Sequence, residues 1–308
     1  MSEYGRRAAG AAEANGFASG RSLHESAKQP DRPTEAAVAT RNATPAGRRR
    51  SGKRPTPKPK HPNPASVLAA FNTWSFKREQ PADPPLMLRF IADAIAVGEP
   101  ISFVLYWGKG PRSTIGEPDL ACLDYLTAFA RRIKEIYEPG AALMLIFTDT
   151  HAQLNGHSPA SMRRYFDEIE VAARRRGFEC CSMGTLEGVA EPELIGLVEG
   201  DVPPDAIKLL SASATKWYRG EGSSEQGAVK YYRMNMIERR AVEIAFPRSI
   251  FITFNGSSLR GLFPERLPIF YMYSLRRGVG VKPWFLPAER APAGDALPSH
   301  PMLHLHEV

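Results

Sequence analysis

The sequence predicts an α/β protein with a mainly parallel sheet flanked by helices. Two continuous apolar runs, 101–106 and 141–147, have the length and composition of strands that are buried on both faces. Segments of helical length separate these runs from each other and from a third short strand at 178–183. Strands that alternate with helices are typical of right-handed crossovers on a parallel sheet with covered faces. We therefore expect a Rossmann-like fold.

The remaining elements follow from apolar periodicity and from Pro and Gly residues at their ends. The predicted helices are 86–97, 118–137, 159–176, 203–218 and 225–246, and further strands are predicted at 251–254 and 269–273. The core positions expected on the first helix are Leu88, Ile91, Ala92 and Ile95. Those on the second are Leu120, Leu123, Leu126, Phe129, Ile133 and Ile136, with Cys122 as a core thiol beside them. Those on the last are Val229, Tyr232, Met236, Val242 and Ile244.

Charge and composition divide the chain into three parts. Residues 1–64 carry 13 Lys and Arg against 5 Asp and Glu and hold few large apolar residues, which predicts a disordered basic tail. The rest carries 27 basic and 28 acidic residues, so it gives no global indication of nucleic-acid binding. We expect one α/β domain at 65–286 and a flexible C-terminal tail at 287–308. The basic tail could make weak, non-specific contact with nucleic acid or anionic lipid.

Other sequence patterns bear on the expected cellular location of the protein and on which cofactors it could bind. No apolar run reaches the length of a transmembrane helix, and three cysteines do not make a disulfide framework, so we expect a cytoplasmic protein. Neither the Gly-x-Gly-x-x-Gly dinucleotide pattern nor a Walker A loop is present, so no nucleotide is specifically indicated. His300, His304 and His306 near the C-terminus could collect a metal, but a frayed tail is the preferred interpretation.

The first candidate site follows strand 101–106, where the apolar run gives way to Trp107, Lys109 and Arg112. Ligands of open α/β sheets bind beyond the carboxyl ends of the strands. A Lys and an Arg on a Gly-rich turn at that place suit a phosphate or a carboxylate. The alternative is a surface turn with solvated cations.

The second candidate site follows strand 141–147 and contains Asp149 and His151. The topology could bring these residues near Lys109 and Arg112, where Asp149 would orient an amine or act as a base and His151 would transfer protons. A metal site that joins His151 and His157 lacks further ligands. The alternative is structural, with Asp149 capping the following turn and His151 on the surface.

The order of several short motifs resembles the isocyanide (isonitrile) synthase family, which includes the pyoverdine and dityrosine biosynthesis proteins. The resemblance covers about residues 86–285. The matching residues are Lys109, Gly116, Pro118-Asp119, Tyr137, Pro139-Gly140-Ala141, Asp149, Tyr165, Met236 to Arg239, Phe246-Pro247, strand 249–255 and Lys282-Pro283-Trp284.

The resemblance implies a Rossmann-like enzyme that converts the α-amine of an aromatic amino acid to an isonitrile without metal or nicotinamide. The added carbon would come from ribulose 5-phosphate, held by Lys109 and Arg112 or joined to Lys109 as an imine. Asp149 and His151 would transfer protons. The residues assigned to substrate binding are Trp107, Arg112, Asn155, Arg239, Asn255 and Trp284.

The chain departs from the family at three positions. Asn255 and Phe285 stand where the family tends to have histidine, and Asn155 falls near an expected acidic residue. These departures point to a changed substrate or a lost activity. Two other functions therefore stay open: a different sugar-phosphate or nucleotide transferase on the same scaffold, and a non-catalytic homologue with a nucleic-acid-binding tail.

Overall fold

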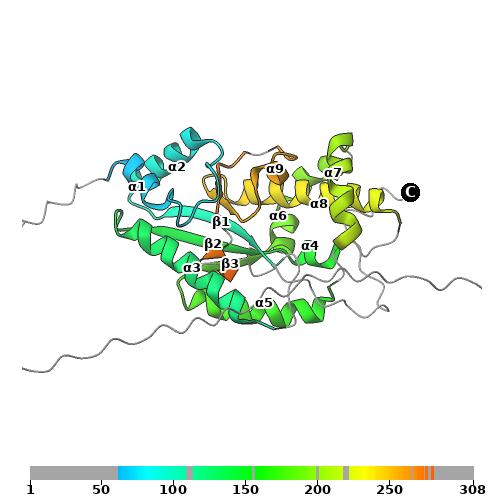
Figure 1. The fold of residues 1–308 in the computed structure, drawn as a ribbon, viewed down its shortest axis with the longest axis horizontal. Coiled ribbons are helices and arrows are strands. Elements are labelled where there is room, and N and C mark those ends of the chain that lie inside the picture. Colours follow the sequence, from blue (N-terminus) through cyan, green and yellow to red (C-terminus); the bar gives the residue numbers. More distant parts are fainter. Residues whose placement is uncertain are drawn as a thin grey trace, which may run out of the picture. The chain divides into compact units, whose positions relative to one another are not determined.

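Five parallel strands form the centre of the fold, and Figure 1 shows helices around the sheet. They are β1 (Ile101–Trp107), β2 (Ala141–Phe147), β3 (Glu179–Ser182), β4 (Ile250–Thr253) and β5 (Ile269–Tyr271). Their spatial order is β3-β2-β1-β4-β5, and every pair of neighbours is parallel. The predicted α/β class and all five predicted strands are confirmed. The chain runs from β1 outward to β3 and then returns to the other side of β1, so the strand order reverses between β1 and β4.

The computed structural model describes residues 62–108, 114–154, 157–198, 201–217, 222–264, 266–273, 275–276 and 279–280. Its helices are α1 (Pro64–Phe71), α2 (Pro84–Val97), α3 (Glu117–Lys134), α4 (Asp149–Leu154), α5 (Pro159–Arg174), α6 (Met183–Val198), α7 (Pro204–Trp217), α8 (Ser224–Ala245) and α9 (Ser257–Arg260). Two further short strands, β6 (Leu275–Arg276) and β7 (Val279–Gly280), pair with each other. The five predicted helices are confirmed with small shifts at their ends.

Four helices were not predicted, and each has a local reason. α4 and α9 are too short for an apolar period to show, and α1 has only two turns. α6 is long, but Gly184, Gly188 and Pro192 lower its intrinsic helix propensity. It also begins immediately after β3, without a turn signal between the two elements.

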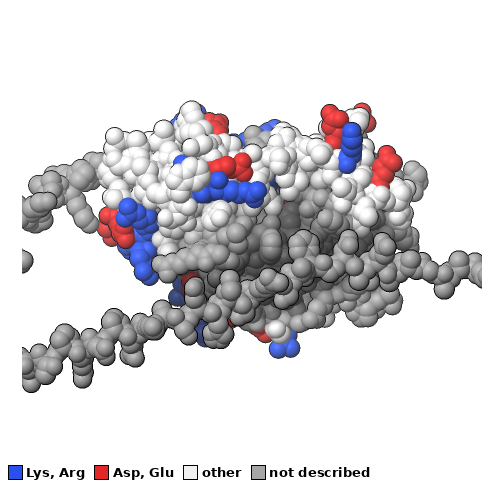
Figure 2. Space-filling model, in the orientation of Figure 1, with Lys and Arg blue, Asp and Glu red and all other residues white. Residues whose placement is uncertain are grey.

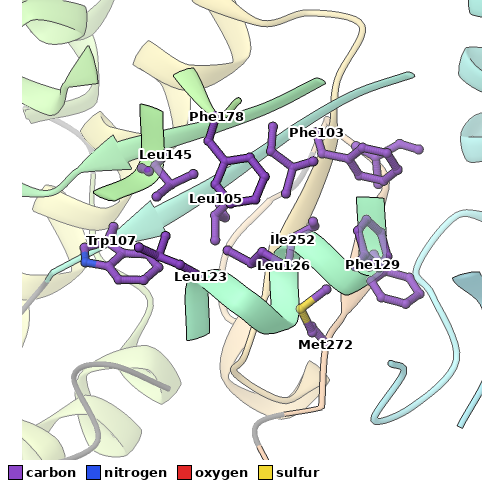
Figure 3. Packing of buried hydrophobic residues seen from close by; sticks show 14 of the residues in the cluster. Phe103, Leu105, Trp107, Leu123, Leu126, Phe129, Leu145, Phe178, Ile252 and Met272 are labelled. Atoms are coloured by element: carbon purple, nitrogen blue, oxygen red, sulfur yellow. The ribbon is translucent and has the colours of Figure 1, made fainter. Parts of the chain in front are cut away.

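The alternation of side chains along the strands creates two separate apolar cores. Ile101, Phe103, Leu105 and Trp107 of β1 face a core that is built with α1, α2, α3 and α5. Val104 and Tyr106 face the opposite core, which is built mainly with α6 and α8. Figure 3 shows the first core, in which side chains of β1 lie against Leu123, Leu126 and Phe129 of α3. The sheet therefore has helices on both faces, as its buried strands predict.

The core stripe of α3 is shorter than predicted. Leu123, Leu126, Phe129 and Ile133 are buried, and so is Cys122. Leu120 and Ile136, however, are 40% and 42% exposed. Leu120 lies in the first turn of the helix, and Ile136 follows its last residue, Lys134, so neither is held on the buried face.

A segment before α2 covers the open edge of the sheet. Residues 76–82, here called the edge segment, run antiparallel to β5 through bridges of Lys77 with Met272 and of Ala82 with Ile269. Arg78 N donates to the Tyr271 carbonyl at 2.8 Å, and Ala82 N donates to the Ile269 carbonyl at 2.9 Å. An unpaired edge invites strand pairing with another chain, so this cover protects β5.

The basic tail before residue 62 and the C-terminal tail at 287–308 lie outside the described residues. On the face drawn in Figure 2, the Lys and Arg side chains of the described part lie in small groups beside Asp and Glu. Within the described ranges, no helix combines the length and the apolar character needed to cross a bilayer.

We predict that the structural boundary of the domain lies before α1. A variant that begins at residue 62 should unfold at the same temperature as the full chain. A variant that begins at residue 84 should lose stability and aggregate, because it lacks α1 and the edge segment. Phe71→Ala should reduce the free energy of unfolding by about 3–5 kcal/mol, since Phe71 contacts the rings of Phe103, Phe129 and Phe270.

Urea denaturation of the purified variants measures these differences. Val97→Ala is the matched control, because Val97 is exposed and its truncation should change the free energy by less than about 0.5 kcal/mol. Equal stability of the two shortened variants would contradict the role given to the edge segment.

Candidate functional site

A pocket lies at the carboxyl ends of β1 and β4, where the strand order reverses. This is the position at which open α/β sheets bind their ligands. The described residues that line the pocket are Tyr106, Tyr231, Asn235, Arg239, Phe251, Ile252, Thr253, Phe254, Asn255, Leu259, Arg260 and Phe263. Polar groups thus converge from β1, from α8 and from the segment that follows β4.

One side of the pocket is a polar stripe along α8. Tyr231, Asn235 and Arg239 are spaced four residues apart, so they lie one above the other on one helix face. Asn235 Nδ2 donates to the Tyr231 carbonyl at 2.8 Å. The spacing of these polar residues is visible in the sequence, but the sequence prediction considered only the apolar positions of this helix. The apolar set itself was partly right, since Tyr232 and Val242 are buried.

The turn after β4 forms the other side of the pocket and is held in two ways. Asn255 N donates to Thr253 Oγ1 at 3.1 Å, which fixes the exit of the strand. Glu79 of the edge segment accepts hydrogen bonds from Ser257 N at 3.0 Å and from Ser257 Oγ at 2.6 Å. The edge segment therefore anchors the start of α9, which carries Arg260 into the pocket.

His151 lies one side chain away from the pocket. It is fully buried on α4, and its Nδ1 is 3.0 Å from Glu238 Oε1 on α8. Its ring meets the pocket residue Tyr231 edge-on at 4.8 Å between centroids. Burial, together with the charge of Glu238, raises the pKa of Tyr231 to about 12, so this phenol stays protonated at neutral pH. The alternative interpretation, in which His151 lies on the surface, is therefore wrong.

Asp149 begins α4 and caps a different helix. Its Oδ1 accepts a hydrogen bond from Gly184 N, at the start of α6, at 3.1 Å. Burial raises the pKa of the Asp149 carboxyl, and backbone N–H groups of residues that include Gly184 oppose this effect. A half-buried carboxylate at this strand end combines a structural contact with the perturbed pKa that is typical of functional groups.

The segment that carries Lys109 and Arg112 lies outside the described residues, but both of its ends are fixed. Before it, Trp107 is fully buried, and its Nε1 donates to Tyr165 Oη at 3.1 Å. After it, Asp119 accepts from Tyr165 Oη at 2.7 Å and from Gly116 N at 2.8 Å. Gly108 packs so closely on α5 that a Cβ there would lie 2.5 Å from Phe166 Cε1. This network ties the end of β1 to the start of α3.

The structure brings together two of the substrate-binding residues predicted from sequence, Arg239 and Asn255. Consecutive side chains of β1 point to opposite faces of the sheet. Tyr106 therefore lines the pocket, whereas Trp107 lies in the core on the other face. Lys109, Arg112, Asn155 and Trp284 lie outside the described residues. The sequence reasoning missed Arg260, Asn235, Tyr231, Tyr106 and Glu238.

Comparisons with known proteins show similarity at the level of the fold. No protein-family model and no curated protein matches the chain. The crystal structure of the PvcA protein from Pseudomonas aeruginosa matches with a TM-score of 0.51 and 18% identity, over 73% of this chain and 86% of that chain. Tyrosyl-tRNA synthetase from Aeropyrum pernix matches at a TM-score of 0.33 and 13% identity, over 68% of this chain and 61% of its own, which supports no argument.

We predict that Asp149→Asn stabilises the protein at neutral pH. The amide oxygen can still accept the Gly184 N–H, but the poorly solvated negative charge is removed. A carboxyl whose pKa is raised on folding favours the folded state only when protonated, so its ionisation lowers stability as the pH rises through the folded pKa. The gain in thermal midpoint should therefore be present at pH 7 and vanish below the unfolded pKa of about 4.

Thermal unfolding across that pH range measures the gain. Asp124→Asn is the control, because the side chain of Asp124 is 61% exposed and a surface ion pair such as the one it makes with Arg176 contributes little to stability. A lower midpoint for Asp149→Asn at neutral pH would show that the charge, rather than the cap, stabilises this turn.

Proposed function

We propose that this chain is a biosynthetic enzyme of the isonitrile synthase type, which joins the amine of an amino acid to a carbon from a sugar phosphate. One observation carries the proposal. Arg239 and Asn255, which the family resemblance assigns to substrate binding, come from different elements and line one pocket at the switch point of the sheet. Arg239 belongs to a matching motif, whereas Asn255 occupies the position at which the family tends to have histidine.

The fold supports the proposal at a coarser level. The resemblance rests on the order of short motifs, whereas the likeness to the PvcA protein rests on the backbone. Several of the motif residues make structural hydrogen bonds. Tyr165 Oη donates to Asp119, and Tyr137 Oη donates to the Glu99 carbonyl at 2.8 Å. These motif residues therefore have structural roles in this chain, and the proposed reaction rests on the pocket.

The proposed roles divide between the pocket and the loops at its rim. The amino acid would lie in the pocket, where Asn255 supplies a neutral amide in place of the family's histidine. An amide donates and accepts hydrogen bonds but does not titrate near neutral pH, which would alter the selection of the amine. Lys109 would form an imine with the ketone of the sugar phosphate, and Asp149 and His151 would move protons.

We predict that the purified protein converts an aromatic amino acid and uniformly ¹³C-labelled ribulose 5-phosphate to a product with one additional labelled carbon. Mass spectrometry of the reaction mixture detects that carbon, and each aromatic amino acid is assayed separately. Lys109→Met and Asp149→Asn should each reduce turnover by at least about 100-fold. The double variant should be no worse than either, because groups that act in one step are not additive.

Arg164→Gln serves as the control, because Arg164 is an exposed residue of α5 that pairs with Glu168. Its turnover should equal that of the unchanged protein. Transfer of a larger labelled fragment would instead indicate a different sugar-phosphate transferase. Binding of the amino acid without any labelled product would indicate a non-catalytic homologue.

A further inference from the structure

Two buried arginines meet in the pocket although they come from separate elements. Arg239 of α8 is 4% exposed, and Arg260 at the end of α9 is 5% exposed. Both also line a smaller cavity beside the pocket, together with Tyr106 and Phe251. Both residues therefore lie at the position where open α/β sheets bind their ligands.

Each guanidinium is held by an aromatic ring. The Cζ atom of Arg239 lies 4.3 Å from the centroid of Phe263, and that of Arg260 lies 4.4 Å from the centroid of Phe251. Phe263 is in turn stacked on Tyr232, with centroids 5.1 Å apart. Contact of a guanidinium with a ring face does not compete with hydrogen bonding, because its N–H donors lie in its own plane. The rings thus fix the arginines as rigid donors.

The rest of the lining completes an environment for an anion on an apolar body. Asn235, Asn255 and the hydroxyl of Thr253 add neutral polar groups, and no Asp or Glu is among the described residues that line the larger pocket. The smaller cavity adds one carboxylate, Glu243, which contacts Arg240 and Arg266. Phe254, Leu259 and Phe263 supply apolar surface beside the arginines. The charge of the larger pocket therefore favours a negative ligand.

We propose that Arg239 and Arg260 form a two-arginine site for the oxyanion of a ligand, a carboxylate or a phosphate, whose planar apolar body packs against the aromatic wall. The inference rests on the proposed function for the reaction that follows binding. It adds to that function a residue that nothing in the sequence had assigned, Arg260, and the chemical group that orients the substrate. Planar paired donors suit an oxyanion better than a single ammonium group does.

The test uses three probes on the full-length protein without any second substrate: phenylacetate, its uncharged analogue phenylacetamide, and inorganic phosphate. Binding is followed through the Nε–H NMR signals of ¹⁵N-labelled arginine, assigned by the variants, and through calorimetry. We expect phenylacetate to shift the signals of Arg239 and Arg260. Phenylacetamide should bind at least about tenfold more weakly, because it keeps the shape but lacks the charge.

Arg239→Gln and Arg260→Gln should each weaken phenylacetate binding by about 10- to 100-fold. Arg240→Gln is the matched control, since it removes the same charge from the next position of α8 without touching the larger pocket. Arg260→Lys, which keeps the charge but loses the planar fork, should bind with intermediate strength. The comparison of phenylacetate with phenylacetamide needs no variant, so it remains decisive if a variant does not fold.

The outcomes show whether the bound oxyanion is a carboxylate or a phosphate. They also distinguish failure of the two-arginine site from failure of the proposed reaction. Phosphate binding that is lost in the same variants, without phenylacetate binding, assigns the site to a phosphate ligand. Equal binding of phenylacetate and phenylacetamide, or no binding of either anion, overturns the two-arginine site. Anion binding without turnover of the amino acid leaves this site standing and rejects only the proposed reaction. Turnover that Arg260→Gln leaves unchanged supports the proposed reaction and rejects the two-arginine site.

Discussion

The period of two along β1 is the constraint on which the rest of the structure depends. β1 lies at the centre of the sheet, paired with β2 on one side and β4 on the other, and it is covered on both faces. Its buried side chains therefore alternate between two cores. The last two residues divide accordingly: Tyr106 reaches the pocket, and Trp107 reaches the network that fixes the start of α3.

The reversal of strand order beside β1 then decides where a site can form. β4 lies next to β1 in the sheet without following it in the chain, because β2, β3 and helices α6, α7 and α8 come between β1 and β4 in sequence. The carboxyl ends of β1 and β4 are left with a crevice that no crossover fills, as in other open α/β sheets. α8 forms one wall of this crevice, and the edge segment anchors the other through Glu79 and Ser257.

The polar groups around this crevice work against stability. Glu238 and His151 are fully buried, Arg239 and Arg260 nearly so, and burial raises the pKa of Asp149. Each ion that leaves water loses several kcal/mol of hydration, which its contacts must offset. Real proteins accept such local conflicts mainly at functional sites. The core of α1, α3 and α5 on the other face is built mainly of apolar side chains, with the hydrogen-bonded Asp119 as a buried charged exception.

The sequence by itself determined the α/β class, the five strands and the long helices, because buried strands and amphipathic helices leave local periodic patterns. It also indicated Arg239 and Asn255, through motif order rather than through any local rule. Only the tertiary structure placed Arg260 beside Arg239, turned Trp107 into the core and buried His151 against Glu238. These relations join residues that are far apart in the chain, and they depend on which strands become neighbours. No local pattern encodes that choice, because the free energy that decides it comes from packing the whole sheet.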